Sequence, residues 1–137
     1  MGTYLNGIPI NPVGGCWLDW ADNSTVLGWS YFTDKYLYYM DLGGVCLVQF
    51  KFSGASNSTT TSFTLPFVGE DFPGGYQNFD CISRNNGSYQ LSGGLVRIAS
   101  ETTLVEAYKN KGYGGWTGVG TKTIEGQFIY RKRTSDG

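Results

Sequence analysis

The sequence predicts an all-β fold: an antiparallel, jelly-roll-like β-sandwich of about eight strands with an extended N-terminal arm. Composition supports it, because 21 of 137 residues are Gly, 16% are aromatic and only 15% are charged, against about 25% in an average protein. Alternation supports it too, since Val48, Phe50 and Phe52 alternate with Gln49 and Lys51. Turn-forming residues also recur about every 8–12 residues, and no segment shows the 3.6-residue spacing of apolar residues that predicts a helix.

The first fifteen residues predict an extended arm, because Gly, Pro and Asn interrupt them at close intervals. Such punctuation argues against a regular element. The arm still carries apolar side chains that should not stay in water, so we expect it to dock on its own domain or on a neighbouring subunit. The remaining residues, 16–137, form the predicted sandwich domain. The side chains expected to anchor the arm are Leu5, Ile8, Ile10 and Val13.

The predicted strands follow one another with short polar connections. Thr33-Asp34-Lys35 is expected to be the first turn, and the Gly/Ala/Ser/Asn/Thr stretch 54–61 a polar tip. On the strand over residues 45–53, Phe50 and Phe52 are predicted to point into the core. The strands are expected at residues 27–33, 36–41, 45–53, 61–66, 76–83, 88–91, 95–99, 104–108 and 121–131.

Charge and targeting signals narrow the class of partner. The net charge is −1, which removes any general electrostatic case for nucleic-acid binding. No stretch approaches the roughly 18 apolar residues of a membrane span, and the N-terminus lacks the features of a signal peptide. Three cysteines without a CxxC motif, Cys16, Cys46 and Cys81, favour reduced thiols and synthesis in a reducing cytosol, with Cys46 buried on its strand.

The residues available for chemistry argue against an enzyme. The chain has no His, which excludes the Ser-His-Asp triad, the Cys-His pair and the usual zinc and iron sites. The carboxylate pairs Asp19/Asp22 and Glu70/Asp71 lie in polar stretches, where such residues usually form turns. Oxygens of Asp19 and Asp22 could bind calcium, although an Asx turn after Trp20 is the preferred interpretation. We therefore expect no catalytic site, no metal and no cofactor.

Two regions are candidates for binding. The aromatic stretch 29–39 could expose rings that stack on sugars, or it could form core and subunit interface. The Gly-rich loop with Tyr113 and Trp116 could be a binding loop, or a turn that tucks Trp116 into the edge of the core. Asn57, on the polar tip, is a third candidate for an exposed contact.

An ordered set of motifs resembles a domain found in phage tail-fibre and other virion proteins. The set is a Tyr-rich strand running into an aliphatic strand (36–52), a polar tip with a Thr-rich strand ending in Leu-Pro (54–66), Asn86-Gly87-Ser88, and Trp-Thr-x-x-Gly-Thr-Lys before an alternating strand (116–130). The resemblance covers roughly residues 27–131. It implies a β-sandwich that packs as a homotrimer around a threefold axis.

The resemblance also implies a function and a location. The expected function is that of a structural protein on the surface of a bacteriophage particle, of the capsid-decoration or tail-fibre-knob type. It would be made in the host cytoplasm and located in the virion. Other virion proteins and host surface glycans are the expected partners. The alternative is a stand-alone carbohydrate-binding module of a cellular protein.

Overall fold

The computed structural model describes residues 4–5, 8–9 and 16–133, and these residues contain strands, turns and loops but no helix. No helix that could cross a membrane is therefore present among them. The all-β antiparallel prediction is confirmed. The strands are β1 (Tyr4–Leu5), β2 (Ile8–Pro9), β3 (Leu18–Asp19), β4 (Trp29–Asp41), β5 (Val45–Ser56), β6 (Ser62–Thr64), β7 (Tyr76–Asn85), β8 (Ser88–Tyr89), β9 (Gly94–Ala99), β10 (Leu104–Tyr108) and β11 (Thr121–Arg131).

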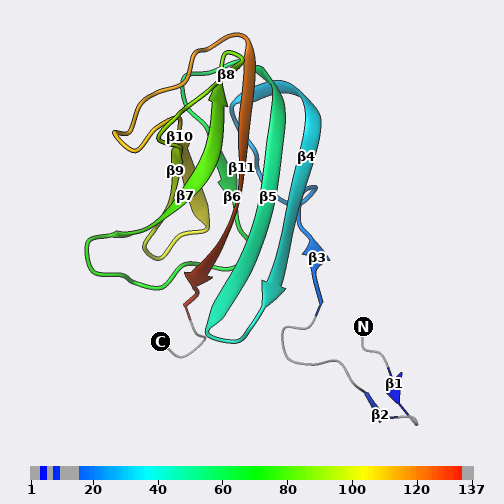
Figure 1. The fold of residues 1–137 in the computed structure, drawn as a ribbon. Coiled ribbons are helices and arrows are strands. Elements are labelled where there is room, and N and C mark those ends of the chain that lie inside the picture. The colour runs from blue at the N-terminus through cyan, green and yellow to red at the C-terminus, as the bar shows by residue number, and fades with distance from the viewer. Residues whose placement is uncertain (1–3, 6–7, 10–15, 134–137) are drawn as a thin grey trace.

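Nine of these strands form one curled antiparallel sheet in the order β3-β4-β5-β11-β7-β9-β10-β6, with β8 beside β7 (Figure 1). Strand β7 joins its two halves, because residues 82–85 pair with β11 and residues 76–81 pair with β9. Leu27, two residues before β4, forms an isolated antiparallel bridge with Ser62, in which each backbone N–H donates to the other residue's carbonyl oxygen. This bridge connects the segment before β4 to β6, the last strand in the sheet order. The ladder is thus continuous, and the sheet curls on itself into a sandwich-like fold in which β7 belongs to both halves.

The arm contains more regular structure than its punctuation predicts. Backbone residues 4–5 and 8–9 pair as a small antiparallel unit, with Tyr4 opposite Pro9 and Leu5 opposite Ile8. Pro9 is compatible with this pairing because an isolated two-stranded unit has only edge positions. The side chains of Leu5 and Ile8, and the whole of Ile10 and Val13, lie outside what the structure describes. Their docking therefore stays a prediction.

The predicted turn at residues 33–35 is wrong. Residues 29–41 form one long strand. Its pairing with β5 shifts register twice, once at Ser30 and once at Thr33. Each shift is a β-bulge, which absorbs one extra residue and twists the strand without ending it. The Thr33 hydroxyl donates a hydrogen bond to the carbonyl oxygen of Ser53 at 3.2 Å, so the bulged residue stays tied to its neighbour.

The polar tip also begins later than predicted, since β5 continues to Ser56. Gly54 lies within the strand because β4 approaches it closely: a Cβ there would lie against the carbonyl oxygen of Tyr31. A glycine inside a strand often marks such an approach of two backbones. Gly54 therefore allows the bulged strand β4 to pack closely on β5. The turn that follows β5 consists of residues 57–61.

The core fills the inside of the curled sheet. Phe50 is 2% exposed and Phe52 is fully buried, so the predicted inward parity of this strand is confirmed. Cys46 is buried on the same face, as predicted, and Cys81 is buried on β7. The largest fully buried apolar side chains besides Phe52 are Tyr130, Phe63, Leu37, Ile98, Ile124, Val48, Val96 and Val105.

The two ends of the sheet differ in character. Loops 57–61 and 109–120 lie at one end, at the top of Figure 1, where Thr121 pairs with Ala55. The opposite end holds the turn between β4 and β5, and there Arg131 pairs with Val45. Because β3 pairs with Tyr38 and Tyr39, near the end of β4, both ends of the described domain emerge beside this turn.

Candidate functional site

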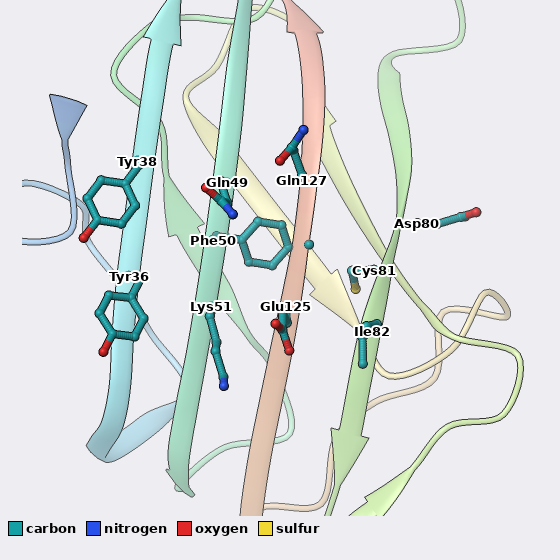
Figure 2. Close-up of a pocket in the computed structure, with 11 residues that line it drawn as sticks. Tyr36, Tyr38, Gln49, Phe50, Lys51, Asp80, Cys81, Ile82, Glu125 and Gln127 are labelled. Carbon is teal, nitrogen blue, oxygen red and sulfur yellow. The ribbon is translucent and has the colours of Figure 1, made fainter. Parts of the chain in front are cut away.

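The outer face of the sheet carries a hollow of about 660 Å3 over strands β4, β5, β11 and β7 (Figure 2). Side chains on a strand alternate between faces, so the residues opposite the core positions point outward here. The register aligns them in two rows across the sheet. One row is Tyr36, Lys51, Glu125 and Ile82, and the other is Tyr38, Gln49 and Gln127, while Asp80 lines the hollow from β7 without a partner on β11.

Two tyrosines form an aromatic wall on one side of the hollow. Tyr36 and Tyr38 are two residues apart on β4, so they share a face, and their rings stack with centroids 6.5 Å apart and planes 16° apart. Tyr36 is 47% exposed. Large rings left in water on a sheet face are candidates for contact with a ligand or a partner.

The hollow lies where β7 separates from β11. Their ladder ends at the pair of Glu125 with Ile82. Further along β11, the side-chain amide of Gln77 makes the two hydrogen bonds that a paired strand residue would make. Its Oε1 accepts from Arg131 N at 2.8 Å, and its Nε2 donates to Arg131 O at 2.9 Å. Alternation directs the backbone N–H and C=O of Gln127 to the same side as those of Arg131, into the split between the strands.

The floor of the hollow is apolar. A Cβ at Gly126 would lie 3.2 Å from Phe50 Cζ and 3.3 Å from Cys81 Cβ, so the bare backbone lets both side chains pack directly under β11. Burial raises the pKa of Cys81 to about 12. This thiol is therefore protonated at neutral pH and belongs to the floor instead of acting as a nucleophile.

The charges around the hollow nearly cancel. Lys51 pairs with Asp34 at 3.6 Å and faces Glu125 across the register, while Asp80 pairs with Lys111 at 3.4 Å. Two ammonium groups against three carboxylates leave one negative charge in excess. All these groups are partly exposed, so water and salt screen them and each pair stabilises the fold only weakly.

The structure separates the three binding residues predicted from the sequence. Tyr113 is 53% exposed, and its ring meets Tyr108 edge-on at 5.2 Å and covers the Arg97 guanidinium at 5.0 Å. Asn57 is exposed on the tip, as expected. Neither residue lines the hollow.

Trp116 is buried, so the exposed position that one of the two sequence interpretations gave it is wrong. Its side chain is only 3% exposed, and Nε1 donates to the carbonyl oxygen of Ala107 at 2.9 Å. The glycines around Trp116 give the loop the freedom to fold the indole inward, which the second sequence interpretation allowed. The ring therefore closes the edge of the core and has no free face to offer.

Sequence reasoning missed a buried lysine beneath the loop end. Lys122 is fully buried, and its Nζ donates to Gly28 O and Thr61 Oγ1, both at 2.8 Å, and to Ser58 O at 3.2 Å. The ammonium also lies 5.1 Å from the Trp29 ring centroid and 5.5 Å from that of Trp116. Desolvation lowers the pKa of Lys122 to about 8. The sequence does carry a signal for this burial, because Lys122 is two residues from Ile124 on β11 and so points to the same, inward face.

One residue of each acidic pair considered as catalytic or calcium-binding makes a structural contact. Asp19 Oδ1 accepts from the backbone N–H of Ala21 at 2.9 Å, as in an Asx turn, and Glu70 Oε2 accepts from Arg131 Nε at 2.7 Å. Within residues 16–133, no three Asp, Glu or Cys side chains gather closely enough to hold a metal ion.

Comparison with protein-family models and with curated proteins gives no relative. No protein-family model matches this sequence, and no curated protein matches it. The site is therefore interpreted from its own geometry.

Proposed function

We propose that this protein is a non-catalytic structural component of the surface of a bacteriophage particle and that it contacts host glycans through the hollow. The observation that carries the glycan-binding part is the stacked Tyr36–Tyr38 pair beside exposed amide and charged side chains. The particle location rests on the motif resemblance over residues 27–131.

The side chains of the hollow suit a sugar better than most ligands. A pyranose has faces of C–H groups, which pack against aromatic rings, and a rim of hydroxyls, which both donate and accept hydrogen bonds. The hollow offers rings on β4 and, within reach of the same ligand, the amides of Gln49 and Gln127 and the carboxylate of Glu125. An open site on the face of a sheet also fits an exposed polymer of weak individual affinity.

The position of the hollow is compatible with a domain that is attached to the particle at one end of its sheet and binds glycans on the outer face of the sheet. Both ends of the described domain emerge beside the turn between β4 and β5. An attachment there leaves the outer face of β4, β5 and β11 in solvent. The predicted anchors of the arm precede this end in the chain.

A cellular carbohydrate-binding module would use the same hollow, so the two candidates differ in location and not in site. Mass spectrometry of purified phage particles separates them. Copies of this chain in the particles support the virion assignment, and its recovery only from host-cell fractions supports the module.

The binding function is tested by removing the aromatic wall. The double variant Tyr36→Ala/Tyr38→Ala should lose about tenfold or more in affinity for any glycan that the intact chain selects from a glycan array, because each ring contact contributes about 0.5–1.5 kcal/mol. Isothermal titration calorimetry measures the loss. Tyr89→Ala, at an exposed tyrosine on β8, is the matched control and should bind unchanged. Equal binding by all three proteins would remove the hollow from the proposal.

We expect the isolated chain to form a trimer. The low charge content and the aromatic surplus leave apolar surface for subunit contacts, and the motif resemblance implies a threefold axis. Light scattering should give about three times the chain mass of 15.0 kDa. A chain lacking residues 1–15 tells whether the arm makes the contact, since it should then scatter as a monomer. A monomeric full chain at micromolar concentration contradicts the trimer.

A further inference from the structure

We propose that the hollow selects a neutral sugar that carries an acetamido group, such as an N-acetylhexosamine in a polysaccharide. This inference rests on the proposed glycan function and adds the class of sugar. Three properties of the hollow lead to it: its charge, its pair of amides and its apolar floor.

The charge of the hollow argues against acidic sugars. Lys51 is the only cation among the residues that line it, and that ammonium already pairs with Asp34 at 3.6 Å and has Glu125 opposite it in the strand register. Asp80 adds a further carboxylate on the opposite wall, held by Lys111 from outside. A carboxylate or phosphate on the ligand would enter a region with one negative charge in excess and would find no guanidinium to bind it.

The amides of the hollow suit a ligand amide. Gln49 and Gln127 are directly opposite each other on β5 and β11, so their carboxamides stand side by side on the exposed face (Figure 2). Each carries two N–H donors and a carbonyl acceptor. The split between β7 and β11 adds the backbone N–H and C=O of Gln127, which have no strand opposite them. An acetamido group needs one donor and one acceptor close together, and this wall supplies both.

The floor supplies an apolar surface next to those amides. Ile82, 52% exposed at the rim, is the accessible part of this surface, because the Phe50 ring and the Cys81 side chain under Gly126 are only 2% and 7% exposed. A hydroxyl placed on this floor would lose its hydrogen bonds to water without replacement, whereas a methyl group would gain contact. The acetamido group is the common sugar substituent that combines a methyl with an amide.

The test compares three trisaccharides with the full chain by NMR titration in about 150 mM salt, which screens remote charges. Triacetylchitotriose and cellotriose differ only in the acetamido group or hydroxyl at C2, and 3′-sialyllactose supplies an acidic sugar. We expect triacetylchitotriose to shift resonances of β5 and β11 around the hollow and to bind about tenfold or more tightly than either of the others.

A pair of matched variants locates the amide contact. Gln127→Glu removes two donors from the hollow and adds a negative charge, and it should weaken triacetylchitotriose binding about fivefold or more. Asn78→Asp makes the same chemical change on an exposed residue of β7 outside the hollow, and it should change binding less than about twofold. Circular dichroism checks that both variants are folded.

The outcomes distinguish this inference from the proposed function. If cellotriose binds the hollow as well as triacetylchitotriose, or if the two variants behave alike, the acetamido selection is wrong and glycan binding stands. If 3′-sialyllactose, whose sialic acid carries an acetamido group and a carboxylate, binds equally well, the selection of neutral sugars is wrong and glycan binding again stands. If none of the three sugars shifts any resonance of the hollow, the glycan function itself fails.

Discussion

Replacing Lys122 with Met should destabilise the fold by about 3 kcal/mol at pH 7. The variant keeps an unbranched side chain that is one atom shorter, and it removes the donor that satisfies Gly28 O, Ser58 O and Thr61 Oγ1. A buried acceptor left without a partner costs about 1–3 kcal/mol, and relief from burying an ammonium offsets part of the sum. Urea denaturation measures the change. Lys51→Met, at a partly exposed lysine on β5, is the control and should stay within about 0.5 kcal/mol of the native protein.

The same variant should reveal a pH dependence. The pKa of Lys122 is lowered to about 8 in the fold, against 10.5 in the unfolded chain. Between these values the unfolded chain binds more protons, so this group makes the free energy of unfolding rise with pH, by up to about 1.4 kcal/mol per pH unit. Below pH 8 it is charged in both states and contributes no slope.

The comparison with Lys122→Met is needed because other groups act in the opposite direction. Burial raises the pKa of Cys46 to about 11 and that of Cys81 to about 12, so above pH 9 these thiols make stability fall. Both proteins share this fall, and it cancels in their difference. The stability difference between native protein and variant should therefore grow from pH 8 to pH 10. A constant difference would show that Lys122 keeps its ordinary pKa.

Replacing Phe50 with Ala should cost about 3–5 kcal/mol of stability, through lost transfer energy and the cavity left behind. The ring is 2% exposed and packs against Phe63 at 5.2 Å and Phe128 at 5.9 Å between centroids. Thermal or urea unfolding measures the loss. Ile129→Ala, at an exposed residue of β11, should change stability far less. A loss below about 1 kcal/mol for Phe50→Ala would mean that the ring is not part of the core.

The sequence predicts the strands better than it predicts their neighbours. Period-two alternation placed Phe50 inward and Gln49 and Lys51 outward, because parity is a local property of each strand. The bulge at Thr33 was missed because a polar residue within a strand has the same composition as a turn. Only the pairing with β5 decides between the two.

The hollow could be predicted only in part, for the same reason. Its outward residues on β5 and β11 were assigned to the polar faces of their strands, and Tyr36 and Tyr38 were considered for sugar contact. Their meeting depends on the register of four strands that are far apart in the sequence. The fate of Trp116 likewise depended on space beside Ala107, and no pattern around the loop encodes that space.

The position of β11 between β5 and β7 sets the order in which the fold can form during synthesis. When the ribosome has released β3 to β10, the central ladder still lacks its middle strand. Strands β5 and β7 then both present open edges, and β5 carries a row of apolar side chains that is buried in the finished fold, Cys46, Val48, Phe50 and Phe52. Such edges recruit other chains, so a nascent or truncated product ending before Thr121 should aggregate or require a chaperone. The late arrival of one strand makes the yield of this protein sensitive to translation rate and to premature termination.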